Sequence, residues 1–384
     1  MSRRIASSRS PYLKPFIAVV SIAGLVAAAT VACSSDEQNK CGDAAHGISC
    51  NDSRDAFADV VTNDGNLEDD AIVPDAADGA ADAHDDATDA SDAGMSIDAA
   101  PIPLATSLSS PWRLAIGGGY VYATSGGNVL KIAMADGATQ TITQAGSIEW
   151  VIADATNLYF TTISGVVYKR AHAGSTNVPI SNATVALQVS GLAVDATYVY
   201  WTEDTNGGTV LRVPIDGSAL AGESVSPGLV LPRGVALSGS DIYVAESAGT
   251  TGTGRILKLA PSKGTPIPLA TNRAGPSRPI TDGTRIFWVE NQGSGLGPVP
   301  SVPLAGGTLV AHAGTAVDPS IVVDGANLYY GNATGGIVKV DIATNVPKIL
   351  YYTDQTGSIY GLGIAGSSLY WTDFNGGRVM TAAK

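Results

Sequence analysis

Apolar and polar positions along this chain alternate in short, strand-length segments, and the same arrangement of segments returns seven times. One copy has an apolar segment at residues 192–194, a short turn at Asp195, and a second apolar segment at 198–202. One position in the second segment is aromatic in every copy, with spacings of 37 to 44 residues: Tyr122, Tyr159, Tyr200, Tyr243, Phe287, Tyr329 and Tyr370. A strand-rich repeat of about 40 residues is typical of a β-propeller, in which each repeat forms one blade.

Each copy continues with a glycine-rich turn and two more strands, so the pattern predicts four-stranded blades. Residues 208–213 read as a third strand and residues 266–270 as a fourth. The last copy ends after its third strand, but Pro101–Thr106 repeats Pro266–Thr271 letter for letter. We therefore predict an all-β, seven-bladed β-propeller over residues 101–384, whose N-terminal strand closes the last blade. Six blades would require one copy to lie outside the ring.

Two copies resemble a known propeller family. Tyr370-Trp371-Thr372-Asp373 matches the YWTD repeat of β-propellers, and Tyr200-Trp201-Thr202-Glu203 nearly matches it. The resemblance covers the repeat region, although most copies are degenerate. It implies a binding module and a structural role for the last acidic residue of the motif, whose carboxylate holds neighbouring blades together in that family. Propellers of the family tend to have six blades, and the seven copies here depart from that number.

The N-terminus has the pattern of an export signal. Basic residues precede an apolar run from Phe16 to Ala32 that ends in small residues. The end of this run, Thr30-Val31-Ala32-Cys33-Ser34, resembles the lipobox of bacterial lipoproteins. The resemblance implies a signal peptide over residues 1–32, a lipidated Cys33 and a membrane anchor. Ser34 in place of Asp implies the outer membrane of a Gram-negative bacterium; an uncleaved signal anchor is the alternative.

Residues 33–100 read as a tether between the anchor and the repeats. Cys41 and Cys50 are predicted to form a small disulfide loop in an oxidising compartment, with a redox or metal-binding pair as the alternative. Residues 54–100 hold 14 acidic residues and one basic residue. Such a charge with few aromatic residues predicts a disordered Asp/Ala-rich spacer. Calcium binding by the acidic tract is the alternative, although no EF-hand loop pattern is present.

The repeat region itself is nearly neutral, because residues 101–384 contain 17 acidic and 16 basic residues. Nucleic-acid binding requires a basic patch or stripe, so we expect no nucleic-acid partner. The expected partner is an unknown protein or carbohydrate ligand of the cell envelope. We expect a monomer, and no residue pattern indicates a cofactor or a metal.

Two sets of equivalent positions predict a ligand-binding face at one end of the ring. Three positions after each aromatic residue, four copies carry an acid: Glu203, Glu246, Glu290 and Asp373. Nine or ten positions before it, where the first strand begins near the channel, lie Arg113, Trp150, Arg233, Arg278 and Tyr360. The loops at these two positions share one face of a propeller, and Arg with aromatic residues suits carboxylate or sugar recognition. Packing between blades is the alternative for both sets.

The sequence contains few features of an enzyme. His172 and His312 are the histidines of the repeats, both lie beyond the third strand, and no nucleophile, metalloprotease or phosphate-loop motif is present. We therefore predict no catalytic residues and a binding or scaffold module. The alternatives are a carbohydrate-active or lyase-type propeller that uses the carboxylates named above, and a structural envelope protein with a protein partner.

Overall fold

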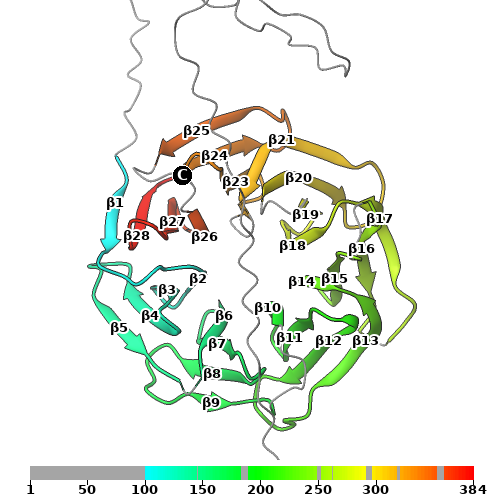
Figure 1. The fold of residues 1–384 in the computed structure, drawn as a ribbon, viewed down its shortest axis with the longest axis horizontal. Coiled ribbons are helices and arrows are strands. Elements are labelled where there is room, and N and C mark those ends of the chain that lie inside the picture. The colour runs from blue at the N-terminus through cyan, green and yellow to red at the C-terminus, as the bar shows by residue number, and fades with distance from the viewer. Residues whose placement is uncertain are drawn as a thin grey trace, which may run out of the picture. The chain divides into compact units, whose positions relative to one another are not determined.

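The repeats form a closed ring of blades around a central axis (Figure 1). The computed structural model describes residues 100–144, 146–182, 189–248, 252–261, 263–290, 296–317, 321–352 and 359–384. Within these residues the strands form seven antiparallel sheets of four strands each. The predicted seven-bladed, all-β fold is confirmed. The predicted signal peptide, lipidated Cys33, the Cys41–Cys50 pair and the acidic spacer lie outside the described residues.

Blades one to four follow one another in chain order, each with its innermost strand first. Blade one contains β2 (Leu114–Gly117), β3 (Tyr120–Ser125), β4 (Asn128–Ala133) and β5 (Thr139–Ile142). Blade two contains β6 (Ile148–Ala153), β7 (Asn157–Thr162), β8 (Val167–Ala171) and β9 (Val178–Pro179). Blade three contains β10 (Val189–Val194), β11 (Tyr198–Glu203), β12 (Asn206–Pro214) and β13 (Glu223–Val230). Blade four contains β14 (Pro232–Ser238), β15 (Asp241–Glu246), β16 (Gly254–Leu259) and β17 (Ile267–Arg273).

Blades five to seven continue the ring, and the last takes its outer strand from the other end of the repeat region. Blade five contains β18 (Pro276–Thr281), β19 (Arg285–Glu290), β20 (Leu296–Pro303) and β21 (Val310–Val317). Blade six contains β22 (Ile321–Val323), β23 (Asn327–Gly331), β24 (Gly336–Asp341) and β25 (Pro347–Tyr352). Blade seven contains β26 (Ile359–Ala365), β27 (Ser368–Asp373), β28 (Arg378–Ala383) and β1 (Ile102–Ala105).

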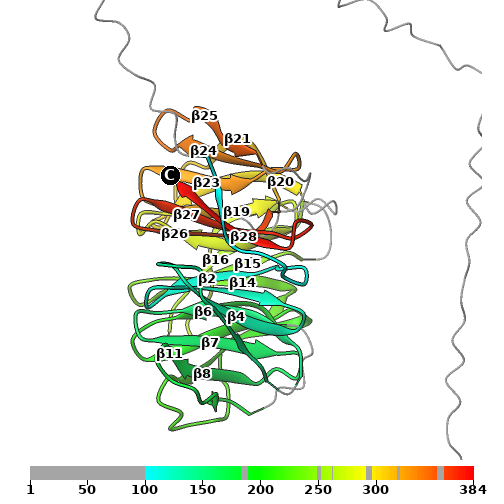
Figure 2. The same ribbon diagram turned by 90° about the vertical axis from the view of Figure 1, so that its left-hand side faces the viewer.

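The N-terminal strand closes the ring as predicted. β1 pairs antiparallel with β28, with Ile102 opposite Thr381 and Pro103 opposite Met380. The two strands lie side by side in both views of the ribbon (Figures 1 and 2). β17, which contains the matching segment, occupies the same outer position in blade four. The repeated segment therefore marks an outer strand, whichever end of the chain supplies it.

Burial is greatest in the second strand of each blade and least in the outermost strand. The second strands are buried along nearly their whole length, as in β3, β7, β15, β19 and β27. Their aromatic residues fill the spaces between neighbouring blades: Tyr243 of blade four, for example, belongs to the same core cluster as Trp288 of blade five. Outer strands such as β5 and β25 are mostly exposed. The regular spacing of the aromatic residues along the chain thus reflects the packing of one blade against the next.

The turn between the first and second strands explains why an aromatic residue follows Asp at a fixed distance. In blade three, Asp195 Oδ1 accepts hydrogen bonds from the backbone N–H groups of Thr197 and Tyr198, both at 2.7 Å. Its Oδ2 accepts a hydrogen bond from the hydroxyl of Tyr200 at 2.9 Å. Blades two and six repeat this arrangement with the pairs Asp154–Tyr159 and Asp324–Tyr329. One carboxylate therefore fixes both the turn and the core aromatic residue.

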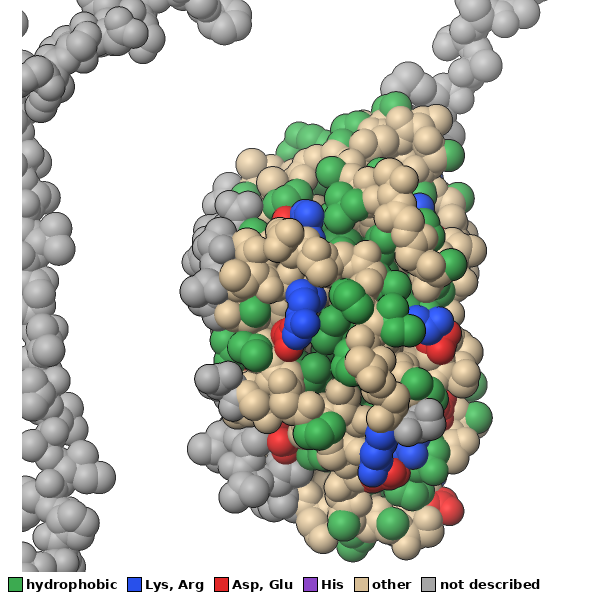
Figure 3. All heavy atoms as spheres, turned by 90° about the vertical axis from the view of Figure 1, so that its right-hand side faces the viewer, with side chains coloured by type: hydrophobic (Ala, Val, Ile, Leu, Met, Phe, Trp, Pro, Cys, Tyr) green, Lys and Arg blue, Asp and Glu red, His purple; other side chains and the backbone are tan. Residues whose placement is uncertain are grey.

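The outer surface carries charges of both signs. On the side of the ring shown in Figure 3, basic side chains lie beside acidic ones, and they form no continuous basic stripe on that face. Among the residues that the structure describes, none belongs to a helix long and apolar enough to cross a membrane.

Candidate functional site

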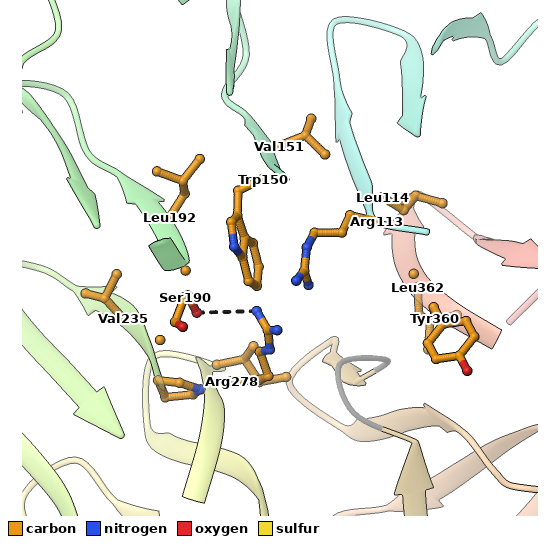
Figure 4. Close-up of a pocket in the computed structure, with 15 residues that line it drawn as sticks. Arg113, Leu114, Trp150, Val151, Ser190, Leu192, Val235, Arg278, Tyr360 and Leu362 are labelled. Atoms are coloured by element: carbon orange, nitrogen blue, oxygen red, sulfur yellow. Dashed lines mark hydrogen bonds between the residues drawn. The ribbon is translucent and has the colours of Figure 1, made fainter. Parts of the chain in front are cut away.

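A cavity of about 160 Å³ opens where the innermost strands begin, at one end of the central channel. Six blades contribute to its wall, through β2, β6, β10, β14, β18, β26 and the residue that precedes β2. Four of the five predicted channel residues line it together: Arg113, Trp150, Arg278 and Tyr360 (Figure 4). Ser190 of β10, which the sequence did not single out, lines it as well. We refer to this cavity as the channel mouth.

Two arginines converge on one tryptophan in the channel mouth. The guanidinium carbon of Arg113 lies 3.4 Å from the centre of the Trp150 ring system, and that of Arg278 lies 3.9 Å from it. Both contacts fall within the range of cation–π interactions. The two guanidinium groups come from blades one and five, yet they are no farther apart than the sum of these distances. Figure 4 shows both of them directed toward the indole from opposite parts of the ring.

Backbone carbonyls hold these three side chains in place. The indole Nε1 of Trp150 donates a hydrogen bond to the carbonyl oxygen of Val189 at 2.6 Å. Arg113 Nε donates to the carbonyl of Glu149 at 3.0 Å, and Arg278 Nη1 donates to the carbonyl of Ser190 at 3.3 Å. These contacts fix the positions of the two arginines and of the indole in the cavity.

The backbone of Arg278 adopts a conformation that side chains other than glycine rarely occupy. Its φ angle is 54°, in the left-handed region. Such strain persists only where the surrounding structure enforces it, and it is concentrated at functional sites. Close backbone packing enforces it here: a Cβ atom on Gly234, whose φ is also positive, would lie 2.8 Å from Cδ of Pro279. Glycine at 234 thus allows the segment that carries Arg278 to approach the neighbouring blade.

Among the described residues that line the channel mouth, the charged side chains are those of Arg113 and Arg278. Glu149, next to Trp150 in the sequence, is half-buried beside Arg113. Burial raises the pKa of Glu149, and the charge of Arg113 offsets this only in part.

Three of the predicted acidic residues form buried ion pairs away from the channel mouth. Glu246 is 1% exposed and pairs with Arg255 of β16; it also accepts the backbone N–H of Val230 at 2.8 Å. Glu290 pairs with Arg273 of β17 at 2.5 Å and accepts a hydrogen bond from the indole of Trp288.

Asp373, in blade seven, is fully buried and accepts a hydrogen bond from Arg378 Nε at 3.0 Å. It also accepts the backbone N–H of Gly376 at 2.9 Å. Asp373 therefore joins strands within its own blade. Glu246 and Glu290 also reach the preceding blade, through Val230 of β13 and Arg273 of β17. A carboxylate that holds neighbouring blades together is the role that the resemblance to YWTD propellers implied for the acid at this position.

The remaining two predicted residues also lie outside the lining of the channel mouth. Glu203 is half-buried at the end of β11, opposite Val189. Arg233 lies one position before Gly234, and Gly234 is the residue of blade four that matches Arg278 of blade five in strand register. The Nε of Arg233 lies 3.3 Å from Oδ2 of Asp204, in an ion pair outside the lining of the channel mouth.

The two histidines of the repeats also lie away from the channel mouth. His172 packs against Tyr122, whose hydroxyl lies 2.7 Å from its Nδ1. His312 is buried on β21, with its Nε2 2.8 Å from the hydroxyl of Ser301. Burial, together with the nearby charge of Arg285, lowers the pKa of His312. In the described part of the chain no group of three His, Cys, Asp or Glu side chains could hold a metal ion.

Comparison with known proteins places the chain by fold alone. No protein-family model and no curated protein matches the sequence. Among solved structures, virginiamycin B lyase from Staphylococcus aureus is similar with a TM-score of 0.57 at 12% identity, over 74% of this chain and 98% of the lyase. A catalytically inactive histidine-to-alanine form of that lyase, with quinupristin, aligns with a TM-score of 0.54 at 14% identity, over 73% of this chain and 97% of the lyase.

Hydrazine synthase from Kuenenia stuttgartiensis aligns with a TM-score of 0.59 at 12% identity, over 73% of this chain and 97% of its own. An antibiotic lyase and a hydrazine synthase differ in chemistry, so the shared architecture carries no single function. The similarity supports the β-propeller fold, and the function must be argued from the channel mouth.

Proposed function

We propose that this protein is an exported, membrane-anchored β-propeller that binds a small carboxylate-bearing ligand at the channel mouth. One observation carries the proposal: Arg113 and Arg278, from two different blades, converge on Trp150 in one cavity. Their guanidinium carbons lie within 3.4 and 3.9 Å of the same ring centre, so one ligand group could contact both. Guanidinium groups bind carboxylates with two parallel hydrogen bonds.

The size of the channel mouth limits what it can hold. At about 160 Å³ it is smaller than the roughly 300 Å³ and more of typical small-molecule sites. It would therefore hold the charged end of a ligand, while the remainder of the ligand lies outside the cavity.

The contacts of the acidic residues favour binding over catalysis. An enzyme using Glu246 or Glu290 would need a carboxylate free to exchange protons or attack a substrate, whereas both are held in buried ion pairs. A lyase that depends on a histidine in the channel would need His172 or His312 there, and both pack within the blades.

Calorimetric titration of the full chain in mild detergent tests the proposal. The probes are acetate, succinate and citrate, at fixed pH and ionic strength. We expect Arg278→Gln to weaken binding of the best probe at least tenfold, since a hydrogen bond to a charged group contributes about 1.5–3 kcal/mol. Arg233→Gln is the matched control, because this arginine lies on the inner strand of blade four, next to the position that matches Arg278, but outside the lining of the cavity. No binding of any probe, or equal losses in the two variants, would refute the assignment.

The membrane anchor is tested separately, because its sequence signals lie outside the described residues. The lipobox-like segment ending at Cys33 supports it. We expect Cys33→Ser to move the protein from the membrane fraction to the soluble fraction, and mass spectrometry of the N-terminal peptide to find a lipid only in the parent chain. A parent chain without lipid would contradict this part of the proposal.

A further inference from the structure

The strand that closes the ring, β1, is held by few contacts. It has four residues, and its register with β28 shifts between Pro103 and Ala105. Pro103 also lacks the backbone N–H that a strand residue donates to its neighbour. Ile102 and Pro103 are exposed, Leu104 is half-buried, and Ala105 is the only buried residue of the strand. β1 therefore completes blade seven while burying little of its own surface.

A connection of residues 106–113 joins β1 to blade one. Its first two residues are exposed. The chain is held again from Leu108 onward, where the backbone N–H of Leu108 donates to the carbonyl of Gly377 at 2.9 Å. The carbonyl of Ser109 then accepts a hydrogen bond from Ser125 Oγ of blade one at 2.8 Å. The chain up to residue 107 can therefore leave blade seven without breaking either of these two bonds.

The backbone of this connection is strained. Eight non-glycine residues in the described part of the chain have a positive φ, and two of them, Ser107 at 60° and Ser110 at 49°, lie here. Side chains other than glycine rarely adopt this left-handed conformation. Ser110 also precedes Pro111, and a residue before proline favours an extended backbone. Ser107 lies between β1 and the first anchored residue, so its strained conformation sets the bend that places β1 on its own ring.

The edge of β28 that β1 covers fits the same strand from a second copy of the chain. β28 pairs with β27 on one side and with β1 on the other, so without β1 its second edge is open. Open edges readily pair with a strand from another chain. Ile102 lies opposite Thr381 and Pro103 opposite Met380, and an identical strand from a second copy makes the same contacts. Figures 1 and 2 show β1 along the outer edge of blade seven.

We propose that β1 exchanges between two copies of this chain, so that the β1 of each copy completes blade seven of the other. The exchange is reciprocal, which gives a closed two-fold dimer and leaves neither β28 edge open. It adds a dimer to the monomer that the sequence led us to expect. The ligand of the channel mouth has no part in it, so this inference stands or falls separately from the proposed function.

Strain in the connection favours the exchange. The monomer and the dimer share the contacts of β1 with β28, so these contacts do not decide between them. The dimer loses the freedom of two separate molecules, and it gains the relaxation of Ser107 to an extended conformation in each chain. A short connection under strain promotes domain swapping for this reason. The fraction of dimer therefore rises with protein concentration, and it depends on which backbone conformation residue 107 prefers.

Disulfide trapping between two separately made variants of the full chain, mixed in mild detergent, tests the exchange. One variant carries Ile102→Cys and the other Thr381→Cys, at positions that lie opposite each other in β1 and β28, within reach of a disulfide. After oxidation we expect a covalent dimer joined through these two positions, identified by mass spectrometry of the linked peptide. The control mixture pairs Ile102→Cys with Val178→Cys, because Val178 is 49% exposed on the outer strand of blade two. The covalent dimer of the control should not exceed the background set by the natural cysteines.

Two substitutions of Ser107 test the connection independently, with the dimerisation constant measured by light scattering across a range of concentrations. Glycine adopts a positive φ without strain, so Ser107→Gly should lower the dimerisation constant about tenfold. Proline fixes φ at about −65°, so Ser107→Pro should raise it. If Ser107→Pro does not fold, the comparison of Ser107→Gly with the parent chain decides.

Three results would each refute the exchange. The first is the absence of the linked peptide from the mixture of Ile102→Cys with Thr381→Cys. The second is an equal yield of covalent dimer in the two mixtures, since chance collision then explains both. The third is a dimerisation constant that Ser107→Gly does not lower.

Discussion

Replacing Glu246 by Gln tests whether the acidic residue after each aromatic motif stabilises the fold. The Glu246 side chain is 1% exposed, pairs with Arg255 and accepts the N–H of Val230 at 2.8 Å. Glutamine keeps a carbonyl oxygen for Val230 but removes the charge and turns an N–H₂ group toward the guanidinium. Loss of a hydrogen bond between charged groups costs about 1.5–3 kcal/mol.

The solvent exposure of Arg255 limits the loss of stability expected for Glu246→Gln. Breaking a fully buried ion pair costs about 3–5 kcal/mol, because the remaining charge is left without solvent. Arg255 is 44% exposed, so water solvates it once Glu246 is gone. We therefore expect a loss of about 2 kcal/mol in the free energy of unfolding, between the values for a hydrogen bond and for a buried pair.

Urea unfolding followed by tryptophan fluorescence measures this loss as a lower midpoint with an unchanged slope. The matched control is Glu223→Gln, which breaks an ion pair of similar type with Arg212 at 2.9 Å but removes a carboxylate that is 44% exposed. Water reaches the Glu223 carboxylate, although Arg212 is only 14% exposed, so this pair should contribute about 1 kcal/mol and the control should change less than Glu246→Gln. The reasoning is refuted if both variants are equally stable, and the structural interpretation of the acidic residues fails if Glu246→Gln abolishes ligand binding without loss of stability.

Two further predictions concern the closure of the ring and the acidic turns. Deleting residues 101–106 removes β1 and leaves β28 as an unpaired edge. We expect the free energy of unfolding to fall by about 3 kcal/mol, because several backbone hydrogen bonds are lost, and we expect self-association, visible by light scattering. A stable monomer would contradict this. Burial alone would raise the pKa of Asp324, but hydrogen bonds from Lys384, the N–H of Asn327 and the hydroxyl of Tyr329 lower it to about 2. A lowered pKa stabilises the fold above the unfolded-state value of 3.8, and this contribution is lost as the pH falls to about 2. Asp324→Asn should therefore cost at most about 2 kcal/mol at pH 7 and nothing at pH 2, as measured by urea unfolding across this range.

The fold could be predicted from the sequence because its determinants repeat. An aromatic residue between blades, an Asp or Gly turn before it and an apolar second strand recur at a nearly constant spacing, and each has a local physical cause. Closure of the ring was also readable, since Pro101–Thr106 has the same letters as the outer strand of blade four. Because the pattern repeats, each copy supports the strands that are predicted in the other copies.

The candidate site was predictable only in part, because its decisive contacts do not repeat. The starts of the inner strands converge by topology, which brought Arg113, Trp150 and Arg278 together as expected. Whether an arginine near that position lines the cavity or pairs with an acid depends on single contacts, as the ion pair between Arg233 and Asp204 shows. The spacing of the repeats carries no information about such pairs.

Trp112 and Glu149 were missed for a different reason. Each precedes a predicted site residue by one position, and in a strand successive side chains point to opposite faces. The segment before β2 is not a regular strand, so Trp112 and Arg113 both line a second cavity, between blades one and two. We considered one position per blade in the sequence and did not consider its neighbour.

The two sets of equivalent positions have different roles: one stabilises the fold and the other faces the channel. Three residues after the aromatic position, the carboxylates of Glu246, Glu290 and Asp373 tie strands together inside the fold, within one blade or between neighbouring blades. Nine or ten residues before it, Arg113, Trp150, Arg278 and Tyr360 line the channel mouth. Substitutions at the first set should therefore reduce stability and spare the ligand, and substitutions at the second should do the reverse. Single substitutions at the channel positions could therefore change which ligand binds, while the packing of the blades stays the same.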